Sequence, residues 1–255
     1  MDGAGAGSNR ALYAMGSMTL LFSFLATVLS GVAVHRTGQI KSDVSGNASD
    51  VSPESEPLVN LQINKNNIKL YHSSGKYDSD LWSLAGNWQA HFEKSLSDTF
   101  PRKDNGTVVV FDCDDTVLSN WPEFLSSDFG YIPNQFDAWV EQGDAPAIKQ
   151  TVEFAQYLYS KGFDLYFITG RKEAWRAPTL KNLRLIGLYV NDDRLILRDD
   201  QELKMQAVEY KSKERARLVA QGIDIAGCVG DQVSDCAGGN AGYIMKVPNY
   251  MYLIE

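Results

Sequence analysis

The residues with the clearest chemistry lie within positions 107–120, in the run TVVVFDCDDTVLSN. Four apolar residues lead directly into the carboxylates of Asp112, Asp114 and Asp115, and Thr116 follows. Carboxylates at this spacing repel one another and resist burial. A strand that delivers them to one place therefore needs a cationic or phosphorylated partner there.

Two later segments also place polar residues directly after an apolar stretch. Residues 169–171, TGR, follow FDLYFI, and residues 230–235, GDQVSD, follow IDIAGCV. Ligands of open α/β sheets bind beyond the carboxyl ends of the strands. We therefore expect all three segments to meet in one site. Each alone would be weak evidence, because Asp and Gly are also common in turns.

The elements that would position these segments alternate between strands and helices. This alternation predicts an α/β fold, a Rossmann-like three-layer sandwich with a mainly parallel sheet. A small helical cap insert is expected at residues 121–146. We expect strands at residues 107–111, 163–169, 194–197, 225–230 and 243–247, and helices at residues 78–96, 134–142, 148–160, 171–186 and 213–221.

The N-terminus carries a membrane signal, because residues 11–34 contain no charged side chain. As a helix they would rise roughly 36 Å, enough to cross a hydrocarbon core of about 30 Å. The length favours an uncleaved anchor within residues 1–36. A cleaved signal peptide is the main alternative, since Gly31 and Ala33 are small residues near a cleavage point. A buried core helix is disfavoured at this position.

Residues 37–57 are rich in Ser, Asp and Gly and are expected to form a linker before a folded domain at residues 58–255. The charges that flank the apolar segment lean toward a cytosolic C-terminal part. Two glycosylation sequons, at Asn47 and Asn105, favour the secretory lumen instead. We expect a single-pass membrane protein or a secretory one, extracellular or vacuolar.

Composition excludes several classes of function. The chain has 255 residues and a formal charge of -8, without a basic stripe, so nucleic acid is not an expected partner. Cys113, Cys228 and Cys236 form no disulfide framework, and no CxxC spacing is present. The three histidines are scattered, which disfavours a zinc site or a histidine phosphatase. Whether the chain forms a homodimer is left open.

The polar segments resemble the motifs of a known superfamily. DxDxT at residues 112–116, TGR at 169–171, a later lysine and GDQxSD at 230–235 are similar to the four motifs of the haloacid-dehalogenase (HAD) phosphohydrolases. More narrowly, FDCDDTVLSN, FITGR, AVEYKSKER, GDQVSD and the closing KVPNYMY resemble class-B-like acid phosphatases and plant vegetative storage proteins. The resemblance spans roughly residues 58–255 and implies a phosphohydrolase fold.

In a phosphohydrolase of this kind, the first motif would carry the nucleophile and the acid-base residue. Asp112 would attack phosphorus and carry an aspartyl-phosphate intermediate. Asp114 would protonate the departing alcohol and then activate water. We expect Asp115 to face solvent or to cap the following turn, and Thr116 to orient the loop by satisfying its backbone groups. Cys113 is expected to be a small buried thiol.

The second and third motifs would hold the phosphoryl group. Thr169 supplies a hydroxyl, and Gly170 lets backbone N–H groups approach a phosphoryl oxygen. Arg171 either adds charge at that site or forms a structural ion pair beneath it. The resemblance points to Lys211, in YKS, as the ammonium that neutralises the phosphoryl group. Lys213, Arg215 and Arg217 are expected to form a solvated helix face.

Asp231 and Asp235 would complete a magnesium site. With the Asp112 carboxylate and, as the resemblance implies, the Asp114 backbone carbonyl, they give an oxygen-rich set suited to Mg²⁺. The cation would also remove the repulsion within the cluster. For Asp235 an N-cap role is the alternative.

The expected function is that of a Mg²⁺-dependent acid phosphatase acting on small phosphate monoesters. A silent storage protein and a phosphotransferase that passes phosphate to an alcohol remain alternatives. Some storage relatives lack the nucleophilic aspartate, whereas this chain keeps Asp112. The aromatic insert within residues 121–146 either roofs the pocket or packs on the sheet, and packing is the safer expectation for most of its side chains.

Overall fold

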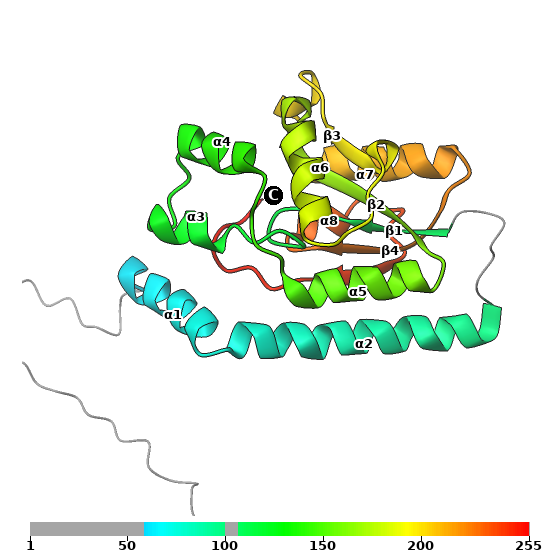
Figure 1. Cartoon of the computed structure of the whole chain (residues 1–255), viewed down its shortest axis with the longest axis horizontal. Coiled ribbons are helices and arrows are strands. Elements are labelled where there is room, and N and C mark those ends of the chain that lie inside the picture. Colours follow the sequence, from blue (N-terminus) through cyan, green and yellow to red (C-terminus); the bar gives the residue numbers. More distant parts are fainter. Residues whose placement is uncertain (1–58, 100–106, 255) are drawn as a thin grey trace, which may run out of the picture. The chain divides into compact units, whose positions relative to one another are not determined.

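The computed structural model describes residues 59–99 and 107–254 (Figure 1). The apolar segment 11–34, the linker 37–57 and the sequon residues Asn47 and Asn105 lie outside the described residues. Within the described residues, no helix is both long enough and apolar enough to cross a membrane.

A parallel sheet of five strands forms the centre of the fold, in the order β3-β2-β1-β4-β5. β1 lies in the middle, and all five of its residues are buried, as expected for an apolar strand covered on both faces. The predicted α/β fold with a parallel sheet is confirmed. The strands are β1 (Thr107–Phe111), β2 (Asp164–Lys172), β3 (Leu195–Arg198), β4 (Asp224–Gly230) and β5 (Tyr243–Lys246).

Helices cover both faces of this sheet. Val109 and Phe111 of β1 belong to a core that also contains apolar side chains of α2 and α5, which run side by side in Figure 1. Val108 and Val110, with the opposite orientation, pack in a second core with α7. The helices are α1 (Leu61–Ser73), α2 (Lys76–Thr99), α3 (Trp121–Ser126), α4 (Pro133–Gln142), α5 (Lys149–Ser160), α6 (Arg176–Leu185), α7 (Ala207–Ala220) and the short α8 (Val233–Cys236).

Three expectations about the elements are corrected. α1 was not predicted, because none of its side chains is buried and it lacks a clear apolar stripe; an Asn60 side chain caps its start. β2 continues to Lys172, which pairs with Arg198 of β3, so the next α-helix begins at Arg176 rather than at residue 171. α7 begins at Ala207 rather than at residue 213, which places Lys211 on the helix.

Candidate active site

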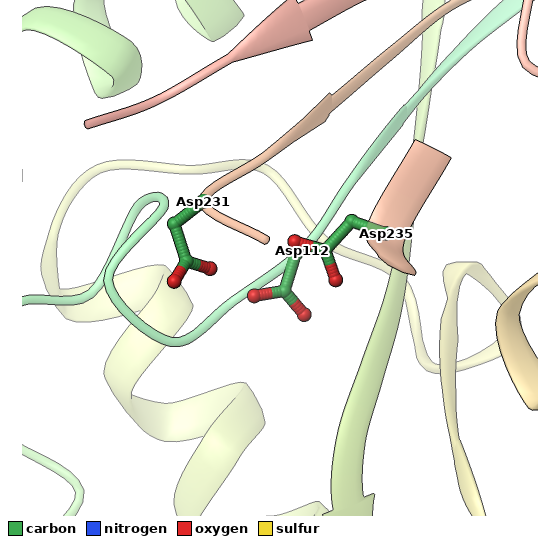
Figure 2. Close-up of side chains that lie close together, drawn as sticks. All are labelled: Asp112, Asp231 and Asp235. Atoms are coloured by element: carbon green, nitrogen blue, oxygen red, sulfur yellow. The ribbon is translucent and has the colours of Figure 1, made fainter. Parts of the chain in front are cut away.

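Three carboxylates meet where β1 and β4 end. Asp112 follows β1, Asp231 follows β4, and Asp235 lies on α8. Figure 2 shows their side chains converging, and one oxygen of each lies within 4.8 Å of the others. All three are buried, with at most 7% of the residue exposed. The fold therefore brings the first and last motifs together, as the sequence predicts.

Lys211 brings a positive charge to this cluster. It lies on α7, is buried, and its ammonium contacts Oδ1 of Asp112 and lies 2.8 Å from Oδ1 of Asp235. Burial alone would lower the pKa of Lys211, but the two carboxylates raise it well above its ordinary value. The lysine is thus held in its charged form beside the Asp112 carboxylate.

Neutral donors satisfy the remaining oxygens of the cluster. Asp231 accepts hydrogen bonds from Gln232 Nε2 at 2.6 Å and from Asn249 Nδ2 at 2.7 Å. The Thr116 hydroxyl lies 3.2 Å from Asp231 Oδ1 and 3.4 Å from Asp112 Oδ2. Thr116 has an orienting role, as expected, but it orients carboxylates instead of the backbone groups of the loop.

Burial makes ionisation of the cluster costly. It raises the pKa of Asp112, and the neighbouring carboxylates of Asp235 and Asp231 raise it further, while Lys211 opposes them. Burial also raises the pKa of Asp231 to about 7, with Asp235 and Asp115 adding to the shift. The cluster therefore favours any further cation that compensates its charge.

Asp114 has a different environment, although it is only two residues from Asp112. Arg171 donates to both of its oxygens, from Nε at 3.0 and 3.2 Å and from Nη2 at 2.7 Å. Burial alone would raise the pKa of Asp114, but the charge and hydrogen bonds of Arg171 lower it below its ordinary value. Arg171 forms the ion pair that we considered beside a direct phosphate contact, and its Nη1 binds Thr179.

Asp115 does not face solvent, contrary to one of our two expectations. It is 3% exposed, and its carboxylate accepts hydrogen bonds from the Asn120 backbone and from the Tyr252 hydroxyl. Its φ of 49° places it in the left-handed region, at the turn out of β1. The second expectation, that it organises this turn, is correct. The C-terminal segment that buries it carries no periodic pattern, so the burial was missed.

The TGR residues are divided between the core and the pocket. Thr169 is fully buried, and its Oγ1 accepts a hydrogen bond from the Arg171 N–H at 3.2 Å. Gly170 lines the pocket, and a Cβ added there would meet no atom within 4 Å. Phosphate binding by these two residues remains a prediction.

The loop after β4 is packed so tightly that it fixes Asp235. Gly230 has no room for a side chain, because a Cβ there would collide with the side chain of Asp235. Oδ2 of Asp235 also accepts from the Gln232 N–H at 2.8 Å, in a capping box at the start of α8. Asp235 therefore caps the helix and belongs to the cluster at the same time.

Arg215 is the second clear correction. It was expected on a solvated face with Lys213 and Arg217, but it is fully buried, and all its guanidinium nitrogens donate to carbonyls in residues 235–239. Arg215 is two residues from both Lys213 and Arg217, so on a helix it points to the opposite side, toward α8. Lys213 and Arg217 do lie near the surface, paired with Glu202 and Glu214.

The cysteines agree with the sequence. Cys113, Cys228 and Cys236 are all free and buried. Burial and the adjacent Asp112 charge raise the pKa of Cys113, so it is a buried thiol rather than a nucleophile.

A cavity of about 480 Å³ opens above the cluster. Its floor includes Asp112, Lys211 and Asp235, and much of its wall is aromatic or apolar. Four of the six aromatic residues of the insert line it, so packing on the sheet is the wrong expectation for them. The apolar and aromatic wall residues are Phe124, Phe129, Tyr131, Phe136, Trp175, Tyr252, Leu253 and Ile254.

Sequence analysis missed several residues that contribute to this site. Tyr252 and Asn249 return from the C-terminal segment, and Asn120 donates to Asp114 at 2.9 Å. The closing segment KVPNYMY contributes to the family resemblance, but no periodicity in it predicts that it folds back onto the site. Arg198 also lines the cavity, and it follows a predicted strand directly, which is the signal that identified the other segments.

The donor set fits a hard divalent cation. Three carboxylates with converging oxygens and no sulfur or imidazole ligand suit Mg²⁺ better than zinc. The side chain of Asp114 is outside this group, because Arg171 holds it.

Comparison with known proteins gives the family. The model of "HAD superfamily, subfamily IIIB (Acid phosphatase)" matches residues 35–255. The chain belongs to this family. It is a phosphatase of the hydrolase class, as the sequence predicted.

Plant proteins are among its relatives. The chain is 36% identical to the stem 28 kDa glycoprotein of Glycine max over 193 residues, 73% of each chain. It is 37% identical to acid phosphatase 1 of Solanum lycopersicum, over 59% of this chain and 60% of the relative. It is 30% identical to vegetative storage protein 1 of Arabidopsis thaliana, over 79% of this chain and 76% of the relative.

A solved structure confirms the fold. The class C acid phosphatase from Bacillus anthracis superimposes with a TM-score of 0.61, at 23% identity, over 76% of this chain and 87% of that one.

Proposed function

We propose that this acid phosphatase hydrolyses small phosphate monoesters through an aspartyl-phosphate at Asp112, with Mg²⁺ as cofactor. The observation that carries the proposal is the position of the Asp112 carboxylate, at the floor of an open cavity and in contact with Lys211. A nucleophile, a fixed cation and space for a leaving group are thus combined in one place.

The chain's own residues divide the chemistry between them. An Asp112 oxygen would bond to phosphorus while the bond between phosphorus and the alcohol oxygen breaks. Lys211 would neutralise the phosphoryl oxygens and reduce their repulsion from the nucleophile. Water would then attack the phosphorus of the aspartyl-phosphate, which releases phosphate and restores Asp112.

Asp114 is proposed as the general acid and base. Arg171 lowers its pKa, so it is ionised at rest and ready to take a proton from the attacking water. Protonating the departing alcohol requires the acid form, which an acidic medium or the substrate itself would supply. This requirement agrees with an optimum at acidic pH.

The magnesium ion is proposed at Asp112, Asp231 and Asp235, whose carboxylate oxygens converge, and the family resemblance adds the Asp114 backbone carbonyl as a further oxygen. When bound, Mg²⁺ would supply positive charge that stabilises the negative charge of the phosphoryl group in the transition state. Gln232 and Asn249 would hold Asp231 in position for it.

A storage role is the second candidate, because relatives include vegetative storage proteins. Retention of Asp112, Lys211 and the cavity argues against a purely silent protein. A phosphotransferase remains open, and added alcohol acceptors would reveal it. The glycoprotein relative and the two sequons support a secretory or vacuolar location, and membrane attachment through residues 11–34 stays a proposal.

The test is phosphate release from a panel of monoesters by the purified full chain, with Mg²⁺ and with a chelator. Asp112→Asn should abolish release, and Asp114→Asn should lower kcat by about 10²- to 10⁴-fold. Asp193→Asn, at an exposed carboxylate outside the cavity, is the matched control. Wild-type activity no higher than that of Asp112→Asn across pH and metals would reject the proposal in favour of storage.

A further inference from the structure

Arg198 is a buried cation of the active-site cavity that none of the steps above uses. It ends β3, is 8% exposed and lines the same cavity as Asp112 and Lys211. Its Nη1 donates to the carbonyls of Glu202 at 3.2 Å and Met205 at 2.7 Å. Its Nε is buried and has no hydrogen-bond partner within the described part of the chain.

Arg215 shows what a purely structural arginine looks like in this fold, because all three of its guanidinium nitrogens bind carbonyls. Arg198 has such partners at one nitrogen only, and its guanidinium otherwise stacks on the Tyr210 ring at 4.7 Å. The Glu202 carboxylate is already engaged by Lys213 and by the Asp199 N–H. Arg198 thus forms no ion pair among the described residues, although burial makes an unpaired charge costly.

The start of α7 faces the same part of the cavity. Ala207 lines it, and Lys211, four residues later, lies on the same helix face. No side chain caps this helix at Gln206, and the first N–H with a backbone acceptor is that of Tyr210. The amides of the first turn are therefore available to an anion, next to an arginine that lacks a counter-ion.

The spacing separates this place from the reaction centre. β3 is the second strand from β1 in the sheet, so Arg198 lies about 10 Å along the sheet edge from Asp112 at strand spacings of about 4.8 Å. Lys211 contacts Asp112, and Ala207, at the start of α7 one helical turn before Lys211, lines the same cavity as Arg198. A second anionic group on the leaving part of a substrate would fit beside Arg198 and the start of α7.

We propose that Arg198 and the N-terminus of α7 form a subsite for a second anion, so that the preferred substrates are phosphate monoesters whose leaving group carries a carboxylate or another phosphate. This inference rests on the proposed function, since it assigns the substrate class of the same site. The apolar wall then contacts the body of the leaving group, and the guanidinium contacts its charged end.

The test compares substrates that share one ring. Phosphate release by the full chain is measured for 4-carboxyphenyl phosphate, for 1,4-phenylene bisphosphate and for 4-carbamoylphenyl phosphate, an uncharged analogue of the carboxylate. We expect kcat/KM to favour a charged substrate over the amide by about tenfold or more, the size of a charge-assisted hydrogen bond. The two charged arms distinguish carboxylate from phosphate.

The variant Arg198→Gln should bring this ratio close to one. Arg184→Gln is the matched control, because Arg184 also donates to a backbone carbonyl, that of Val190, but does not line the cavity. A ratio of two rates on one preparation is insensitive to loss of folded protein. A wild-type ratio near one, or an equal fall in both variants, would overturn the subsite.

A binding measurement separates this proposal from the proposed function. Calorimetry with Asp112→Asn, alone and combined with Arg198→Gln, gives the Kd of the same ligands without turnover. Tighter binding of a charged ligand that is lost with Arg198 supports the subsite even if the wild type releases no phosphate. Equal Kd values for charged and amide ligands, or no binding of either, would overturn it.

Discussion

The Tyr252 hydroxyl donates a hydrogen bond of 2.7 Å to Oδ2 of Asp115, and so joins two residues 137 positions apart. Burial raises the pKa of Asp115 to about 7, and the bond from Tyr252 opposes that shift. The C-terminal segment thereby fixes the turn that leads out of β1, directly after Asp112 and Asp114, the proposed nucleophile and acid-base residue.

Removing this hydroxyl should destabilise the fold. We expect Tyr252→Phe to lower the free energy of unfolding by about 1–3 kcal/mol, because Asp115 stays buried with one donor fewer. Tyr189→Phe is the control, since Tyr189 is 78% exposed. Urea unfolding of the three proteins measures the difference, and equal midpoints would show that this bond contributes nothing.

Arg171 should not tolerate replacement by lysine. A single ammonium cannot reproduce the two-nitrogen contact with Asp114, so we expect Arg171→Lys to cost about 1–3 kcal/mol and to reduce kcat. Arg217→Lys changes the pair that the exposed Arg217 forms with Glu214 and should cost less than about 1 kcal/mol. Comparable shifts in the two variants, measured by urea unfolding, would contradict a special role for the buried pair.

Magnesium should stabilise the folded protein independently of turnover. Binding to the native cluster alone would add about 2.7 kcal/mol at one hundred times the Kd, visible as a rise in Tm. Asp235→Asn keeps an acceptor for the Gln232 N–H but removes one charge, so the rise should shrink. Asp193→Asn should respond like the wild type. A full magnesium-dependent rise in Asp235→Asn would place the ion elsewhere.

His72 should make stability depend on pH. It stacks on Trp121 at 3.8 Å between ring centroids, and burial lowers its pKa from 6.5 to about 4, with Asp78 opposing. Below pH 6.5 the His72 side chain is protonated in the unfolded chain, whereas in the folded chain it stays neutral down to about pH 4. The stability from this group is therefore complete above pH 6.5 and is lost as pH falls toward 4.

The variant His72→Phe keeps an aromatic ring against Trp121 and removes this titration. We expect it to lose less unfolding free energy than the wild type between pH 7 and pH 4.5, as measured by urea unfolding at both values. Parallel losses in the two proteins would show that His72 does not cause the acid sensitivity.

The centre of the fold and much of the site follow from the sequence because they obey local rules. An apolar run such as β1 must be buried on both faces, and the carboxyl ends of parallel strands share one edge. The sequence alone therefore predicts that Asp112 and Asp231 lie close together. The same rule applies to Arg198, which directly follows another predicted strand. Its place at the site could therefore have been predicted, but it was missed.

The errors concern contacts between distant segments. Arg215 is a charged residue that sequence reasoning assigns to solvent, and for Asp115 solvent was one of two expectations. Each is buried by a segment without periodicity. Asp115 lies under the chain around Tyr252, and Arg215 under the loop at residues 235–239. α1 was missed for the opposite reason, because its residues are too exposed to leave an apolar stripe.

The contact of Lys211 with two carboxylates has a consequence for how the protein matures. Each acid of the cluster already has a donor from the chain itself, Lys211 for two of them and Gln232 with Asn249 for the third. The carboxylates are thus satisfied by the folded chain itself, so the proposed Mg²⁺ would load into a site that has already formed.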